Sequence, residues 1–218
     1  MEYLILIAMA VGIPLLYFGI LQWYKMDFEQ EQNQNRILLR TIPELLVVLV
    51  SEAAMVKIWY DYRSESLSGI LFVLLYTVLI FMSILCMTDY WETIVPNRIL
   101  VLMLLICLLE IGIWGAREPE QFLKLLPTII LGLLFCMISF GVGYLLSRGS
   151  MGSGDVKLAI LLGIFLTSEY VVGTVFYGCV ISALFSIVQL SRKKLTRKDQ
   201  IPFVPFLYMG LIVTYFMG

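Results

Sequence analysis

The chain has 218 residues, of which 61% are hydrophobic and only 14% are charged, and its formal net charge is −1. Soluble domains are about 45–50% apolar and about 25% charged, so this composition excludes an ordinary water-soluble protein and predicts lipid as the main solvent. The near-neutral charge argues against nucleic acid as a partner. Histidine is absent, which excludes histidine triads and histidine metal sites and leaves acid–base chemistry to carboxylates, Lys, Tyr, Cys or water.

Apolar runs separated by polar breaks predict an all-α, polytopic bundle of about eight transmembrane helices. A helix needs about 20 apolar residues to cross the hydrocarbon core of a bilayer. On that criterion we expect spans at residues 3–24, 42–60, 68–87, 99–114, 123–146, 155–166, 170–190 and 203–217. The sixth run is short for a span, so we expect it to lie among other helices, to begin within the membrane or to be tilted.

The basic residues of the polar breaks predict the orientation, because Lys and Arg accumulate in cytoplasmic loops. With both termini outside, the inward-facing breaks hold most of them, namely Lys25, Arg36, Arg40, Arg98, Arg148, Lys157, Arg192, Lys193, Lys194, Arg197 and Lys198. The outward-facing breaks and the adjoining span ends hold Lys57, Arg63, Arg117 and Lys124. In this orientation Asp89, at the end of the third run, and Asp155, at the start of the sixth, lie at the same cytoplasmic face.

The cysteines and two deep glutamates suggest no site of their own. The four cysteines, which form no CxxC pair, are Cys86, Cys107, Cys136 and Cys179. All four lie in apolar runs, so we expect small buried hydrophobic residues rather than a zinc site or disulfides. Glu52 and Glu110 also lie in runs but belong to no motif. We expect them to pair with Lys57 or to line a polar cavity, and we assign them no role.

Asp89 and Asp155 are the candidates for chemistry. Taken alone, each is an interfacial residue or a helix N-cap, since a carboxylate accepts backbone N–H groups. Asp155, however, follows Gly152 and Gly154 in the sequence GSGDVK. Glycines beside a carboxylate let the backbone adopt unusual torsions and approach a substrate chain closely.

The segment after the first aspartate predicts a short break between two helices. It reads DYWETIVPN, from Asp89 to Asn97. Pro96 disfavours helical torsions in the residue before it, and Asn97 is a suitable N-cap for the next span.

These two segments together resemble a known family. GSGDVK resembles the GxGDxK element of the type IV prepilin leader peptidases, a branch of the GxGD membrane aspartyl proteases. DYWETIVPN resembles the first-aspartate element of that family, in which six residues separate the aspartate from Pro-Asn or Pro-Asp. Two weaker similarities follow the family's order, RTIPELL at residues 40–46 and IPFVPFL at residues 201–207.

The resemblance implies that Asp89 and Asp155 are a catalytic pair that needs neither metal nor cofactor. Two carboxylates about 3 Å apart share one proton, so one activates water and the other acts as acid. Support for the pair or for substrate binding is expected from Gly152, Gly154, Lys157, Pro96, Asn97 and Glu44. Lys157 is otherwise an interfacial anchor, and Glu44 is otherwise a structural partner of Arg40.

The same resemblance implies a single membrane-embedded peptidase domain over residues 1–218. Residues 1–41 would form the first span and a short cytoplasmic loop, and residues 42–218 the protease core. The loop has no cysteine, whereas many members carry two CxxC pairs there, associated with N-methylation of the product. The chain therefore resembles the short forms, for which methyl transfer is not implied.

The implied substrate is a prepilin-like membrane protein with a short basic leader and a glycine just before the cut. We expect cleavage at the cytoplasmic face of a cell's inner membrane, in contact with the lipid bilayer. The acidic residues Asp27, Glu29 and Glu31 are the candidates for receiving the leader. The sequence leaves the pilin substrate and the oligomeric state open.

Two other functions compete with this one. A presenilin-like or signal-peptide-peptidase-like GxGD protease would act on a different substrate, but Thr88 rather than Tyr precedes Asp89, and no PAL motif follows. An ion-coupled transporter would use Asp89, Asp155 and Glu110 as ion ligands. Broken helices mark transporter sites, yet no inverted repeat is present, and both aspartates are predicted at one face rather than at the midplane.

Overall fold

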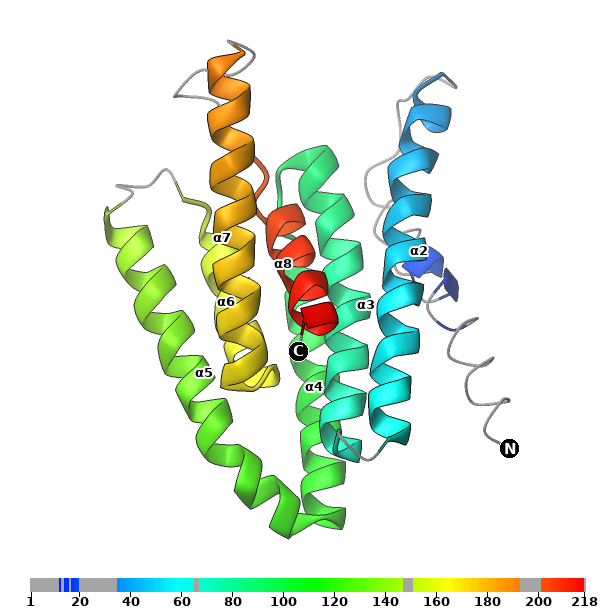
Figure 1. Cartoon of the computed structure of the whole chain (residues 1–218), viewed down its shortest axis with the longest axis vertical. Coiled ribbons are helices and arrows are strands. Elements are labelled where there is room, and N and C mark those ends of the chain that lie inside the picture. The colour runs from blue at the N-terminus through cyan, green and yellow to red at the C-terminus, as the bar shows by residue number, and fades with distance from the viewer. Residues whose placement is uncertain are drawn as a thin grey trace.

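The computed structural model describes residues 12, 14–15, 17–19, 35–64, 67–146, 151–192 and 201–217. In the segment 35–64, side chains are described from residue 43 onward. Seven helices follow one another in this part of the chain: α2 (Asn35–Arg63), α3 (Gly69–Glu92), α4 (Asn97–Arg117), α5 (Pro119–Leu146), α6 (Ser153–Phe165), α7 (Ser168–Ser191) and α8 (Val204–Met217). Short helical pieces cover residues 12–19 where they are described. The predicted all-α bundle is therefore confirmed (Figure 1).

Four helices, α3, α4, α5 and α7, are long and apolar enough to cross a membrane on their own. The chain is thus a multi-pass membrane protein. Helix α2 carries several charged residues, and α6 and α8 have only 13 and 14 residues. The expected shortness of the sixth span is confirmed. The predicted span at residues 3–24 lies largely outside the described residues, as do Asp27, Glu29 and Glu31.

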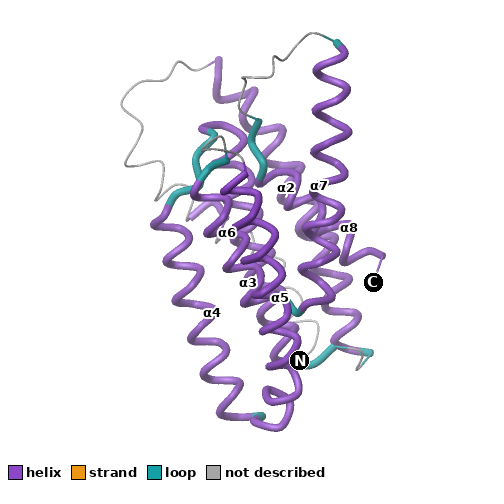
Figure 2. The backbone as a smooth tube through the Cα atoms, turned by 90° about the vertical axis from the view of Figure 1, so that its left-hand side faces the viewer, coloured by secondary structure: helices purple, strands orange, loops and turns teal. Residues whose placement is uncertain are grey.

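Helix α3 forms the centre of the bundle. Its apolar window is 83% buried, against 22% for α4, 17% for α5 and 22% for α7, so α3 faces protein where the others face lipid. It contacts α2, α4, α6 and α8, and the views in Figures 1 and 2 show these helices around it. Cys86 on α3, Cys107 on α4 and Cys136 on α5 are buried as expected. The expectation was wrong for Cys179, which is exposed on the outer side of α7.

Polar contacts between helices account for several side chains inside the apolar runs. The Tyr208 hydroxyl of α8 donates to the Val47 carbonyl of α2 at 3.1 Å and lies 2.7 Å from the Ser51 hydroxyl. Thr77 of α3 donates to Glu110 of α4 at 2.6 Å. Such bonds matter in lipid because no water is present to satisfy a polar group.

Of the two alternatives expected for the deep glutamates, pairing with Lys57 is not found among the described residues. Lys57 forms an ion pair with Asp61 one turn further along α2, at 2.9 Å. Glu110 takes its hydrogen bond from Thr77 instead. Residues four positions apart lie on the same face of a helix, so Lys57 reaches the Asp61 carboxylate within α2.

Helix α8 packs on α7 more extensively than on any other helix, and glycine makes that close approach possible. A Cβ at Gly210 would overlap the Thr174 carbonyl oxygen and would lie 2.6 Å from the Gly178 nitrogen. Small residues at such crossings let helix backbones meet, which is the main source of association in lipid. Close van der Waals packing of the two backbones therefore contributes to the association of α7 with α8.

We expect Gly210→Ala to destabilise the protein by about 1–3 kcal/mol, because the added methyl group must push α8 away from α7. Thermal unfolding of the purified protein in one detergent measures the change. Gly112→Ala on α4 is the matched control, since nothing lies within 4 Å of a Cβ there. Equal melting temperatures for Gly210→Ala and Gly112→Ala would contradict this packing.

Candidate active site

The carboxyl groups of Asp89 and Asp155 lie at the same end of the bundle. Asp89 occupies the last turn of α3, and Asp155 occupies the first turn of α6. Figure 1 shows these two helix ends at the upper part of the bundle, next to the start of α8. Helices α3 and α6 are in contact, and Gly154, beside Asp155, lies against Val95 in the segment after Asp89, so the fold brings together two motifs that are far apart in sequence.

The chain after Asp89 turns sharply at Thr93. The third helix continues one turn beyond the predicted end, through Asp89 to Glu92, and the Thr93 N–H closes it by donating to the Asp89 carbonyl at 2.8 Å. Thr93 has φ 53°, the left-handed region that a β-branched residue rarely adopts. This strained turn directs the following residues across the end of α3, and such strain is often found beside functional sites.

The predicted break extends from Thr93 to Pro96. Pro96 is the N-cap of α4 with extended backbone torsions, and its carbonyl accepts the first bonds of that helix. The expectation that Asn97 caps α4 was wrong, because Asn97 is already the first helical residue. Its side-chain oxygen accepts a hydrogen bond from Lys157 at 2.9 Å instead. This hydrogen bond links the segment that follows Asp89 to the first turns of α6.

Gly154 explains why a glycine precedes the second aspartate. A Cβ at Gly154 would lie 2.8 Å from the Val95 Cβ and 3.4 Å from the Val95 carbonyl oxygen. Only a residue without a side chain lets α6 start directly against the break that follows Asp89. The Gly154–Val95 contact therefore determines how closely the two aspartates approach.

Gly152 leaves room for the second carboxylate itself. It is the N-cap of α6, and a Cβ there would lie 3.1 Å from Oδ2 of Asp155. The Asp155 side chain therefore folds back over the first turn of its own helix, where the helix dipole favours negative charge. The alternative in which Asp155 is itself the N-cap is not found, since Asp155 lies three residues after Gly152.

Asp89 takes its hydrogen bond from the start of α8. Its side chain is only 4% exposed, and its Oδ2 accepts a bond from the Val204 N–H at 2.9 Å. The Phe203 N–H is also directed at this carboxylate. The first N–H groups of a helix have no partner within the helix, so Asp89 caps α8 from another part of the chain.

These backbone donors were not among the predicted site residues. The segment IPFVPFL did suggest that residues 201–207 belong to the family pattern. Every residue except proline has a backbone N–H, however, so the residue type does not show which N–H donates to the site. Pro202 and Pro205 are the sequence features that frame the Phe203–Val204 pair, because both restrict the chain at this helix start.

The remaining predicted site residue, Glu44, is buried on α2 and interacts electrostatically with Tyr17 of the N-terminal segment. Glu110 lies far from the aspartates along the bundle. Its partner Thr77 precedes Asp89 by three turns of α3, roughly 18 Å. The ion-ligand set of Asp89, Asp155 and Glu110 that a transporter would need is therefore not assembled.

Comparison with known proteins identifies the chain's relatives. Residues 74–187 match the model of the type IV leader peptidase family, and both aspartates fall in this stretch. The chain is 26% identical over 157 residues to a prepilin leader peptidase/N-methyltransferase of Bacillus subtilis, covering 66% of this chain and 56% of the relative. It is 28% identical over 114 residues to a protein of the same name from Haemophilus influenzae, covering 50% of this chain and 47% of the relative.

The chain thus spans about half the length of these curated relatives. No solved structure matches it.

We expect Gly154→Ala to destabilise the protein by about 1–3 kcal/mol, because the methyl group would overlap Val95 and displace the start of α6. Val95→Gly in the same chain should restore part of the loss by removing the group it strikes. Thermal unfolding of the two single variants and the double variant gives the coupling. Gly141→Ala, where a Cβ meets nothing within 4 Å, is the control, and strictly additive effects would contradict the contact.

The matched residues cover more than half of the chain and contain both aspartate elements, so this protein belongs to the type IV leader peptidase family.

Proposed function

We propose that this protein is a membrane aspartyl endopeptidase that removes the short basic leader from a prepilin-like precursor, with Asp89 and Asp155 as the catalytic pair. The observation that carries the proposal is the position of Asp89 and Asp155 at one end of the bundle, where Gly154 lies against Val95, inside the stretch that matches the family. The names of the two relatives support the substrate class.

We propose a role for each aspartate, supported by the hydrogen bond to Asp89. The Val204 N–H donates to Oδ2 of Asp89, and a carboxylate accepts a stronger hydrogen bond than a neutral carboxyl group does, so this contact favours the ionised form of Asp89. The first turn of α6 also favours negative charge on Asp155, but only Asp89 receives a direct backbone N–H bond. We therefore place the shared proton on Asp155, because two close carboxylates do not both ionise. Asp89 is the proposed general base, and Asp155 is the proposed general acid.

Hydrolysis follows from these roles. Asp89 takes a proton from a water molecule as the water oxygen attacks the scissile carbonyl carbon, while Asp155 gives its proton to the carbonyl oxygen. The tetrahedral intermediate then collapses, the C–N bond breaks, and the proton held by Asp89 passes to the leaving amine. Asp155 recovers a proton from the intermediate's hydroxyl group. Each step uses only the two carboxyl groups and water.

We further propose that the aspartates face the cytoplasm. The breaks at their end of the bundle include Arg98, Lys157 and the basic segment that begins at Arg192, and cytoplasmic segments are rich in Lys and Arg. A leader on that side would reach Asp89 and Asp155 without crossing the bilayer. The proposal concerns the peptidase reaction, and residues 25–41, which hold no cysteine, give no support to a proposal of methyl transfer.

Asp89→Asn and Asp155→Asn should each lower the cleavage rate by about 10²–10⁴-fold, since each removes one of the two proton-transfer groups. The measurement is a gel-shift assay of a purified prepilin-like precursor with the detergent-solubilised protein. Mass spectrometry of the product gives the cut site. Glu120→Gln, an exposed carboxylate at the other end of the bundle, serves as the control. Cleavage at the wild-type rate by either aspartate variant in folded protein would refute the catalytic pair.

Val204→Pro should lower kcat about tenfold or more with little change in KM, because it deletes the N–H that holds Asp89 but touches no substrate. Proline suits the first helical position, where Val204 lies, so the helix itself should persist. Val204→Ala trims the side chain, keeps the donor and should retain activity. Equal kcat values for the Pro and Ala variants would show that the bond does not hold the base.

A further inference from the structure

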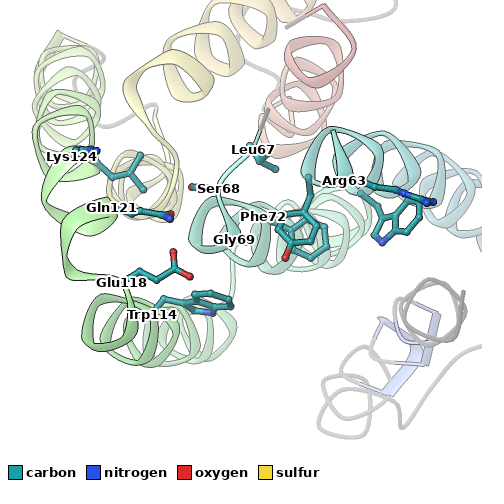
Figure 3. A pocket seen from close by; sticks show the side chains of 12 residues that line it. Arg63, Leu67, Ser68, Gly69, Phe72, Trp114, Glu118, Gln121 and Lys124 are labelled. Atoms are coloured by element: carbon teal, nitrogen blue, oxygen red, sulfur yellow. The ribbon is translucent and has the colours of Figure 1, made fainter. Parts of the chain in front are cut away.

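A cavity of about 760 Å³ lies at the end of the bundle opposite the aspartates. Its walls come from the end of α2, the start of α3, the end of α4 and the start of α5 (Figure 3). Gly69 lines it and Asp89 lies near the far end of the same helix, roughly 30 Å away. The cavity is therefore a separate site, on the other side of the membrane from the candidate active site.

Two polar atoms in the cavity wall lack a hydrogen-bond partner. They are Oε2 of Glu118 and the hydroxyl oxygen of Ser68, and both are buried. Figure 3 shows the Glu118 side chain extending toward the segment that carries Ser68. A buried carboxylate oxygen without a donor is unfavourable and needs an explanation. Glu118 forms no ion pair with any described residue, so a cationic N–H donor from a ligand would satisfy it.

Aromatic rings line the space beside this carboxylate. Gly69 leaves room for the Trp114 ring, because a Cβ there would lie 3.1 Å from it. Tyr62 and Phe72 stack with ring centroids 4.6 Å apart on another side. Aromatic faces attract cations, most strongly where water is excluded. Glu118 and the Trp114 ring together therefore suit an ammonium group.

The opposite charge is present at the same cavity. Lys124 is exposed on the first turns of α5 and, like Glu118, lines the cavity. Arg63 also lines the cavity, and its guanidinium lies over the Trp59 ring, 5.4 Å from the ring centroid. Glu118 and Lys124 form no ion pair with each other in the described structure, which leaves an anionic position and a separate lysine cation in a single site. An ammonium near Glu118 and a phosphate near Lys124 would match both. That is the charge pattern of a phosphoethanolamine group.

The surroundings indicate that this group belongs to a lipid. Trp59, Tyr62 and Trp114 lie at helix ends, where Trp and Tyr mark the membrane interface. Just beyond Lys124, the apolar side chains of Leu123, Leu126 and Ile130 on α5 are exposed. A molecule with its headgroup in the cavity could lay its acyl chains along this face. We propose that the cavity binds an aminophospholipid, with the ammonium at Glu118 and the phosphate at Lys124.

The test uses purified, delipidated full-length protein and measures the shift in melting temperature on adding lipid in detergent micelles. Phosphatidylethanolamine should raise the melting temperature of the wild type. Phosphatidylcholine should raise it less, because its quaternary ammonium has no N–H to donate to Glu118. Phosphatidylglycerol, which has no amine, should give the smallest shift. A phosphatidylglycerol shift as large as that of phosphatidylethanolamine would overturn the proposal.

Variants locate the effect. Glu118→Gln should weaken apparent phosphatidylethanolamine binding at least fivefold and remove its advantage over phosphatidylcholine. Lys124→Met should weaken both lipids. Glu120→Gln, which is close in sequence but outside the cavity, should bind as the wild type does. Undiminished ethanolamine preference in folded Glu118→Gln protein would overturn the assignment.

A further comparison separates lipid from a soluble ligand. Soluble phosphoethanolamine at the same concentration should give less than a tenth of the lipid's effect, and an equal effect would overturn the lipid proposal in favour of a free phosphate ester. Native mass spectrometry should find a bound phosphatidylethanolamine on the wild type and not on Glu118→Gln. Leader cleavage by the same samples is a separate readout, so a failure here does not bear on the proposed peptidase activity.

Discussion

A carboxylate buried among apolar helices must be given a partner, and Asp89 finds one in the first turn of α8. This single contact satisfies two groups at once, because the N–H of Val204 also lacks a partner within its own helix. It joins the last turn of the central helix to the last helix of the described chain. The arrangement of the end of the bundle around Asp155 depends on it, since α6 lies against the break that begins just after Asp89.

The elements of the site are connected through backbone rather than through long side chains. Gly154 meets Val95, Gly152 leaves room for the Asp155 carboxylate, and Val204 donates to Asp89. The exception is the bond between Lys157 and Asn97, which lies at the exposed edge. Backbone contacts vary less in length than side-chain contacts do, because they involve no rotamer choice. The positions of Asp89 and Asp155 therefore depend on how α3, α6 and α8 pack against one another.

The sequence predicted α3, α4, α5 and α7 well because each is a long apolar run with polar ends. Helix α6 was expected at residues 155–166 and found at Ser153–Phe165. The misplaced cap at Asn97 has a physical cause: Pro96 already has the extended torsions that an N-cap needs, which freed the asparagine for Lys157. Cys179 was misassigned because an apolar residue in lipid gains nothing from being buried in protein. The Val204 hydrogen bond and the cavity at Glu118 each involve the ends of different helices. The pattern of one apolar run does not show which helix ends lie side by side, so neither feature could be predicted.

The unequal lengths of α6 and α7 have a consequence for the membrane itself. The two helices form an antiparallel pair (Figure 1), and α7 has 24 residues where α6 has 13. Helix α7 therefore continues about 16 Å beyond the level at which α6 begins. Helix α6 itself is about 20 Å long and does not reach across a hydrocarbon core of about 30 Å on its own. Asp155, in the first turn of α6, therefore lies below the level at which α7 ends, within the depth of the bundle.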